Sequence, residues 1–229
     1  MTDDALKVYE KAESLDEELF NKYNESWYES LVKNYENNPN HKIYYLEYDE
    51  DKTNPIGSKD NIVHIRNENK NSAKRWYLGE GFDKADGDFI ADGEGYRFWE
   101  IDNHLRIDKG EFRNGVPNGN GVILHYMRDS SKDDLKITRV FRGEIYNAVP
   151  DGYGVRQIFD ENEEVVRISG GIFSNGLLDG YGYEINRNEN NEETRVQGFF
   201  ENDYINKGIL IYSDNSKYEG ELSNGIASG

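Results

Sequence analysis

The sequence contains no cysteine, which excludes disulfide bonds and thiolate zinc sites within its 229 residues. It has four histidines, and no two of them stand at the spacing that places a pair of metal ligands on one helix face. No apolar run approaches the ~18 residues that a membrane span requires, and the acidic N-terminus lacks the apolar core of a secretory signal. We therefore expect a cytoplasmic protein without a metal, a cofactor or a transmembrane segment.

Apolar residues are also scarce, at 35% against ~45–50% in typical globular chains. Because 17 Tyr, 10 Phe and 3 Trp supply much of that share, the composition favours a thin sheet covered by aromatic side chains over a thick core. The formal net charge of −18 would repel nucleic acids and anionic membrane surfaces. It indicates either a solubility device or attraction to another protein that is basic.

Motifs for catalysis are missing from the sequence. There is no nucleophile elbow, and no glycine-rich phosphate loop precedes a predicted helix. Asp86-Gly87-Asp88 resembles a fragment of a calcium loop, but the alternating ligands of a full loop are absent, and a turn explains it. We expect no catalytic residue, and the chain is interpreted as something other than an enzyme.

Residues 1–40 are predicted to form an amphipathic helical segment. Its apolar residues recur at three- and four-residue spacing: Val8, Ala12, Leu15, Leu19, Tyr23, Trp27 and Leu31. Ser14 to Glu17 forms a capping box, so a second helix could start at Leu15. The stripe either packs on a sheet or binds a partner. Residues 41–76 then hold short strands, at His41–Tyr48 and Ile62–Arg66, read as a hairpin before a polar linker.

Residues 77–229 are predicted to be a repeat array, because glycines recur at fixed intervals. Anchor glycines stand at 79, 110, 143, 171, 198 and 220. In the clearest copies, further glycines follow at offsets of nine and eleven. The repeat glycines are Gly110, Gly119, Gly121, Gly143, Gly152, Gly154, Gly171, Gly180 and Gly182. We expect aromatic side chains of neighbouring strands to lie over the glycines at offsets nine and eleven.

Two columns between the anchors have a physical meaning. Two residues after each of the last five anchors stand the expected sheet-core residues Phe112, Ile145, Phe173, Phe200 and Leu222. Four residues after each of the same five anchors stands an asparagine, and a glycine often follows, as tight turns with positive φ require. The predicted turn residues are Asn114, Gly115, Asn147, Asn175, Gly176, Asn202, Asn224 and Gly225. Each unit is therefore predicted to be a strand, a tight turn and a strand.

This pattern resembles the MORN repeat, whose unit opens with Tyr-x-Gly-Glu and closes with a Gly-x-Gly pair before an alternating strand. Tyr77-Leu78-Gly79-Glu80 and Tyr218-Glu219-Gly220-Glu221 match the opening most closely. The middle copies depart from it, with Asp108, Phe141, Ser169 and Val196 in place of the opening Tyr. The resemblance implies a mainly β fold, an elongated antiparallel meander of hairpins, with contacts to proteins or lipids.

The function predicted from these features is a non-catalytic binding or scaffold module that docks other proteins through its sheet and N-terminal helix. The alternative is an acidic immunity or inhibitor protein that neutralises a basic toxin or enzyme. Phosphoinositide binding is suggested by the resemblance and disfavoured by the charge. The candidate partner-contact residues are Trp27, Tyr153, Tyr181 and Tyr218.

The C-terminal end of the array is expected to pair Lys217–Leu222 with Ile209–Tyr212, which leaves the other edge of this strand without a partner. Repeat arrays need a cap at such an edge. Charged side chains, the N-terminal helix or another protein could cover it. Because the helix is expected to serve the first copies, we predict that this edge joins a partner or a second copy of the chain.

Overall fold

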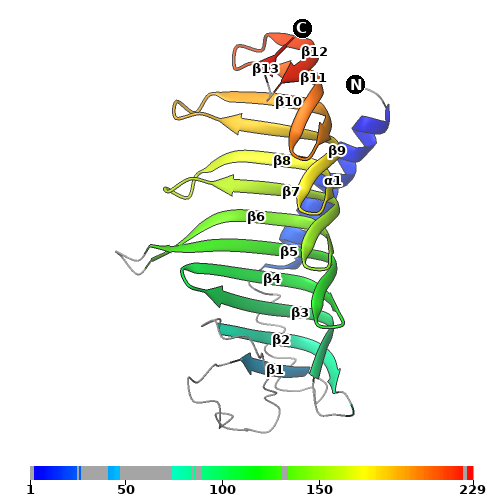
Figure 1. Ribbon diagram of the computed structural model, residues 1–229, viewed down its shortest axis with the longest axis vertical. Coiled ribbons are helices and arrows are strands. Elements are labelled where there is room, and N and C mark those ends of the chain that lie inside the picture. Colours follow the sequence, from blue (N-terminus) through cyan, green and yellow to red (C-terminus); the bar gives the residue numbers. More distant parts are fainter. Residues whose placement is uncertain are drawn as a thin grey trace.

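The structure is a computed structural model that describes residues 3–24, 26, 41–46, 74–83, 85, 89–129, 134–223 and 226–228. These residues form one helix, α1 (Asp3–Lys22), and an elongated sheet in which each strand lies antiparallel to the next along the chain (Figure 1). The strands are β1 (His41–Leu46), β2 (Lys74–Asp83), β3 (Phe89–Ile101), β4 (His104–Arg113), β5 (Val116–Asp129), β6 (Asp134–Tyr146), β7 (Val149–Phe159), β8 (Val165–Ser174), β9 (Leu177–Arg187), β10 (Glu193–Glu201), β11 (Tyr204–Ile211), β12 (Lys217–Ser223) and β13 (Ile226–Ala227). The predicted mainly β antiparallel meander is confirmed, and the sheet does not close.

A single row of glycines crosses the sheet. Each strand from β2 to β12 contributes one glycine to the row, and neighbours in the row pair with each other: Gly79, Gly95, Gly110, Gly121, Gly143, Gly154, Gly171, Gly182, Gly198, Gly208 and Gly220. At Gly110 a Cβ would stand 2.7 Å from the Cα of Gly121, which real Cβ atoms do not tolerate. The backbones therefore approach most closely along this row, and only glycine fits there.

The two faces of the sheet differ in what covers them. On β6, Val140, Arg142 and Glu144 alternate with Phe141 and Ile145. We call the first side the helix face, because Val140 packs against Leu19 and Tyr23 of the N-terminal segment. The other side is called the turn face, because side chains in mid-strand there reach the tight turns. These faces follow from the two-residue alternation of strands.

The main core lies on the turn face. Phe112, Phe173 and Phe200 are 1% exposed, and Ile145 and Leu222 are 4% exposed. From Ile145 to Leu222 they belong to one cluster that runs along the array, and the rings of Phe141 and Phe173 meet edge to face at 5.2 Å. Each such buried side chain stabilises the fold by ~1.5–3 kcal/mol. The sheet is thus held by an apolar line along β5 to β12, with a separate cluster of Tyr77, Ala91 and Phe112 in the first copies, and not by a round core.

The tight turns are built alike. Asn114, Asn147, Asn175 and Asn202 have φ between 49° and 52°, and the residue after each also has positive φ. Positive φ at both central residues is the type I′ geometry that suits a two-residue hairpin.

Each of these turns is bonded to the preceding hairpin. The second turn residue donates its backbone N–H to a carbonyl there: Gly115 to Ala91, Ala148 to Pro117, Gly176 to Pro150 and Asp203 to Leu178, at 2.8–2.9 Å. Neighbouring repeats are therefore tied together at their turns as well as along their strands.

Helix α1 lies across the middle of the helix face, over β5 to β9 (Figure 1). Val8, Ala12, Leu19 and Tyr23 of the predicted stripe are buried, while Trp27 and Leu31 lie outside the described residues. The helix is continuous from Asp3 to Lys22, so the expected new start at Leu15 is wrong. Continuity keeps Val8 and Leu19 on one stripe, and the burial of both outweighs the local cap.

Two further expectations concern the ends of the array. Strand β1 pairs with β2, the first strand of the array; its expected hairpin partner, Ile62–Arg66, lies outside the described residues, so that hairpin stays a prediction. Against the expectation that the helix serves the first copies, it lies mainly over the middle ones, while Lys22 and Tyr23 at its C-terminal end reach the first copy, at Glu94. At the other end, β12 pairs with β11 from Lys217↔Ile211 onward, and β13 pairs back only at Leu222 and Ser223.

Candidate binding faces of the sheet

The helix face is occupied from within the chain. Val8 packs among Tyr153, Ile172, Tyr181 and Tyr183. The ammonium group of Lys11 lies 3.7 Å from the centre of the Tyr153 ring, a cation–π contact. The aromatic side chains of β7 and β9 on this face are therefore used to hold α1.

Polar contacts fix the helix at its C-terminal half. The Asp16 carboxylate accepts a hydrogen bond from Arg142 Nη1 at 3.2 Å, and burial raises the pKa of Asp16 while Arg142 opposes that rise. The Tyr23 hydroxyl donates to Glu94 at 2.9 Å, and Lys22 pairs with the same carboxylate at 2.7 Å. Burial, followed by the Glu94 charge, raises the pKa of Tyr23. The Tyr23 phenol therefore stays neutral and acts as a donor.

The candidate partner-contact residues do not form one surface. Tyr153 and Tyr181 pack against α1 on the helix face, so they contribute to an interface inside the chain. Tyr218 lies on the turn face beside the main core, and its hydroxyl donates to the carbonyl of Glu221 at 3.0 Å. Trp27 lies outside the described residues, as do Asn224 and Gly225 of the predicted turns.

No aromatic ring covers the glycines at offset nine. In two copies the glutamate after the anchor reaches across the hairpin, and Glu144 accepts a hydrogen bond from Tyr153 N at 2.8 Å. A Cβ at Gly152 would overlap the Glu144 carboxylate, one at Gly119 would overlap that of Glu111, and one at Gly180 would meet Ile172. At offset eleven an aromatic ring lies over Gly154, whereas Ile145 and Leu178 lie beside Gly121 and Gly182. The expectation is therefore wrong at offset nine, where backbone N–H groups attract an acceptor in two copies, and it holds at offset eleven for Gly154 alone.

The opening-tyrosine column shows how the middle copies differ. Tyr77 donates its hydroxyl to the carbonyl of Glu80 at 2.9 Å, the same contact that Tyr218 makes. Asp108 occupies the equivalent place and is 1% exposed. Arg97 and Arg106 both bond to its carboxylate, at 2.6–2.9 Å, and Arg106 also donates to the carbonyl of Ala148 in the next turn. The buried charge is therefore paired on both sides, as burial demands.

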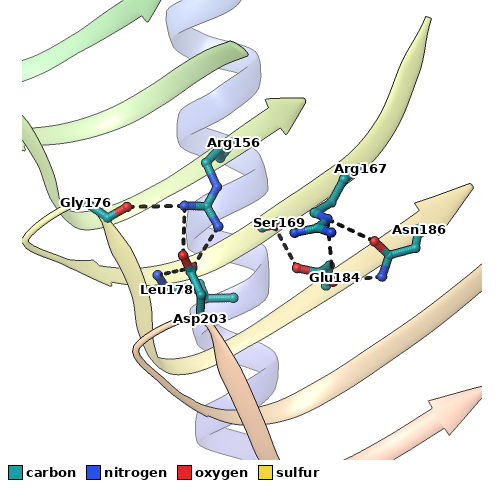
Figure 2. Close-up of polar contacts among 8 residues, drawn as sticks. All are labelled: Arg156, Arg167, Ser169, Gly176, Leu178, Glu184, Asn186 and Asp203. Atoms are coloured by element: carbon teal, nitrogen blue, oxygen red, sulfur yellow. Dashed lines mark hydrogen bonds and ion pairs between the residues drawn. The ribbon is translucent and has the colours of Figure 1, made fainter. Parts of the chain in front are cut away.

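A second buried polar group lies farther along the turn face, on β7, where Arg156 pairs across the strands with Phe141 and Ser169 of the opening column. Arg156 donates to Asp203 at 2.7 Å and to the carbonyl of Gly176 at 3.2 Å, so one mid-strand arginine ties two turns (Figure 2). Asp203 also accepts from Leu178 N at 2.7 Å. The Arg156 guanidinium lies 5.3 Å from the centre of the Phe173 ring. This arrangement holds the turns over the sheet.

Beside it, Ser169, fully buried at the next opening position, approaches Glu184 at 3.4 Å. Glu184 also accepts from Asn186 at 2.7 Å, and Arg167 donates to Asn186 at 3.0 Å (Figure 2). Every charged group in this small network has a partner within the chain.

The expectations from sequence omit a column of arginines. Arg75, Arg106, Arg139 and Arg167 each stand four residues before an anchor glycine, and cross-strand pairing places them in one row across the sheet. The same repeat period that reveals the glycines also carries this signal. His125 lies in the row, and its pKa is lowered to about 4 by burial first and then by Arg106 and Arg139. The histidine is therefore neutral near pH 7.

The described residues offer little for cofactor chemistry. Within these ranges no group of three or more His, Asp or Glu could hold a metal ion. No helix in the same part of the chain is long and apolar enough to cross a membrane. A shallow hollow between two hairpins is lined by Glu111, Arg113, Asn120, Glu144, Tyr146 and Asp151.

Comparison with known families agrees with this geometry. A family model of the MORN repeat matches residues 109–125 and 171–189. The first match covers the turn half of the β4–β5 hairpin with Asn114, and the second covers most of the β8–β9 hairpin with Asn175. No curated protein matches the chain. The resemblance inferred from sequence is confirmed, and the chain carries MORN repeats.

Proposed function

We propose that this MORN-repeat chain is a non-catalytic binding module that docks another protein on the turn face of its sheet. MORN repeats suggest a binding or scaffold role and are generally non-catalytic. The observation that carries the proposal is the unequal cover of the two faces. Helix α1 occupies the helix face, whereas the described part of the chain places no helix over the turn face. Beside its buried core residues, the turn face leaves Arg139 and Arg167 exposed on neighbouring repeats, which suits an extended protein contact.

The N-terminal helix takes a smaller part in docking than its stripe alone predicts. Its apolar side is buried against the sheet, so only its outward side chains remain, among them Leu6 at 43% and Phe20 at 62% exposed. The Arg142 guanidinium already lies 5.1 Å from the Phe20 ring centre. We therefore assign the main contact to the turn face.

The acidic inhibitor remains the alternative, and one observation favours it. The connections after β7 and β9 expose acidic side chains, including Glu161, Glu164, Glu189 and Glu192. They project at the ends of hairpins, where a basic protein could reach them without displacing any strand. Capture of a basic target would then depend on charge and not on the turn face.

The test is retention of proteins from the native source by the immobilised chain, with an unrelated protein of similar charge and size as control. A retained protein is then purified and its affinity is measured at about 0.15 M and about 0.5 M salt. Docking on the turn face predicts one-to-one binding whose salt dependence is unchanged when Glu161, Glu164, Glu189 and Glu192 are replaced by Gln. A steep loss at high salt that disappears in this variant supports the inhibitor reading.

Liposomes with phosphoinositides form a third arm of the test. Saturable binding to them, with no protein retained above the charge-matched control, would overturn the protein-docking proposal.

A further inference from the structure

The row of arginines across the sheet is regular, and from Arg106 to Arg167 its side chains lie on the turn face. Its members pair strand by strand in the order Arg75, Trp99, Arg106, His125, Arg139, Ile158, Arg167, Asn186 and Thr194. Arginine stands on every second strand, from β2 to β8, and no acidic residue stands between them. Because neighbouring strands are ~4.8 Å apart, successive arginines are spaced by roughly 9.6 Å.

The arginines of the row differ in whether their guanidinium groups are bonded to other residues of the chain. Arg106 is held by Asp108 and by the Ala148 carbonyl, and Arg167 contacts Asn186 and Glu184. Arg139 is exposed, and it has no hydrogen bond or ion pair with any residue that the structure describes. The centre of the row is therefore a guanidinium that is available for an external acceptor.

The carboxylates near the row are already engaged. Asp108 lies between two arginines, Glu184 accepts from Ser169 and Asn186, and Asp203 is held by Arg156 and by a backbone N–H. The row is thus locally cationic on a chain whose formal net charge is −18.

We propose that the arginine row binds an extended acidic segment of a partner protein, which crosses β6 to β8 and presents one carboxylate to Arg139 and the next one to exposed Arg167. This inference rests on the proposed function and names the chemistry of the partner. Guanidinium groups bind carboxylates with two parallel hydrogen bonds. A polyproline II segment rises ~3.1 Å per residue with three residues per turn, so acidic residues at every third position align at about 9.3 Å. That repeat matches the spacing of the row.

A short segment fits the charge of the whole molecule better than a large anionic surface does. A membrane or a nucleic acid extends beyond the row and meets the acidic remainder of the chain, which repels it. A segment lying on the row is within a Debye length of ~8 Å of the arginines and largely screened from more distant charge.

The experiment uses the full chain and a fluorescent peptide of about four Glu-Pro-Pro units, measured by anisotropy at low and physiological salt. A peptide of the same composition with its glutamates contiguous tests the spacing. We expect saturable binding of the spaced peptide, weaker binding of the contiguous one, and about tenfold weaker binding by Arg139→Gln. Arg195→Gln is the matched control, since exposed Arg195 lies on the helix face beside Tyr183 and pairs with Glu193.

Several outcomes would overturn the proposal. They are no saturable binding of the spaced peptide, equal affinity for both peptides, or equal losses with Arg139→Gln and Arg195→Gln. Binding of anionic vesicles that depends on Arg139, without peptide binding, would assign the row to lipid instead. A native partner that binds Arg139→Gln unchanged would refute the row and leave the docking function intact. Failure to retain any native partner would refute the docking function alone.

Discussion

Exchanging alanine and glycine in the turn column tests the backbone geometry directly. Ala148 is the second residue of the Asn147 turn and has φ 67°. Gly176 is the second residue of the Asn175 turn and has φ 86°. Both residues donate the same N–H bond to the preceding hairpin, at 2.9 and 2.8 Å. A Cβ at Gly176 would meet only Pro150 Cδ at 3.9 Å, so no clash accompanies the change. The two sites therefore differ mainly in the residue that adopts the left-handed conformation.

We expect Ala148→Gly to stabilise the protein and Gly176→Ala to destabilise it, each by about 1 kcal/mol, because a left-handed residue with a Cβ costs ~1–2 kcal/mol. In a chain of this size that energy shifts the melting temperature by roughly 2–4 °C. Thermal denaturation followed by circular dichroism measures both shifts, and urea unfolding gives the free energies.

Gly115→Ala serves as the control, since its site has φ 85° and nothing within 4 Å of the added Cβ. It should behave like Gly176→Ala. The reasoning is refuted if Ala148→Gly lowers the melting temperature, or if the two glycine variants melt at the wild-type temperature.

Three further predictions follow from the polar contacts. Gly152→Ala should destabilise by ~2–4 kcal/mol, more than a turn glycine with open space around it, because the new Cβ adds displacement of the Glu144 carboxylate to the positive-φ cost; similar urea midpoints for the two classes would contradict this. The pKa of His125 is about 4 in the fold and near 6.5 when unfolded, so the unfolded state binds more protons between these values and stability falls as pH drops from 6.5 toward 4. His125→Gln should reduce this loss of stability at low pH by ~1–2 kcal/mol, a figure that allows for the partial exposure of the imidazole. The measurement is the difference in unfolding free energy between pH 7 and pH 4.5, which should be smaller in the variant than in the wild type. Asp203→Ala should cost ~2–4 kcal/mol, since it leaves the Arg156 guanidinium buried without its carboxylate, and a double variant with Arg156→Met should lose less than the sum of the single changes in a denaturation cycle.

The repeat architecture could be predicted from the sequence because its signals are local. A hairpin is specified by an asparagine at the turn, alternating residues in the strands and a glycine at the anchor, and all three recur along the chain. The position of α1 could not be predicted in this way. Its stripe shows that the helix packs on something, but the copies offer similar aromatic residues, and only tertiary packing selects β5 to β9.

The binding face was predictable only in part. The aromatic candidates Tyr153 and Tyr181 look like contact residues in the sequence, yet α1 lies on them. Arg139 is unremarkable in the sequence until it is aligned on the anchor glycines. Arg139 has no partner among the described residues because Asp108 bonds to Arg106 and Asp203 bonds to Arg156. No local sequence pattern specifies that choice of partners.

The turn hydrogen bonds give the array a direction. The donor in each turn comes later in the chain than its acceptor; for example, the N–H of Gly176 bonds to the carbonyl of Pro150. On a ribosome, every hairpin therefore emerges after the backbone acceptor on which its turn docks, so the array can lengthen one unit at a time without waiting for later sequence. Shortening the chain is correspondingly asymmetric. Removal of later repeats leaves a turn-binding carbonyl without its N–H donor, and water can replace that donor. Removal of earlier repeats leaves a turn N–H without its carbonyl acceptor, and folded proteins leave N–H groups unpaired least often.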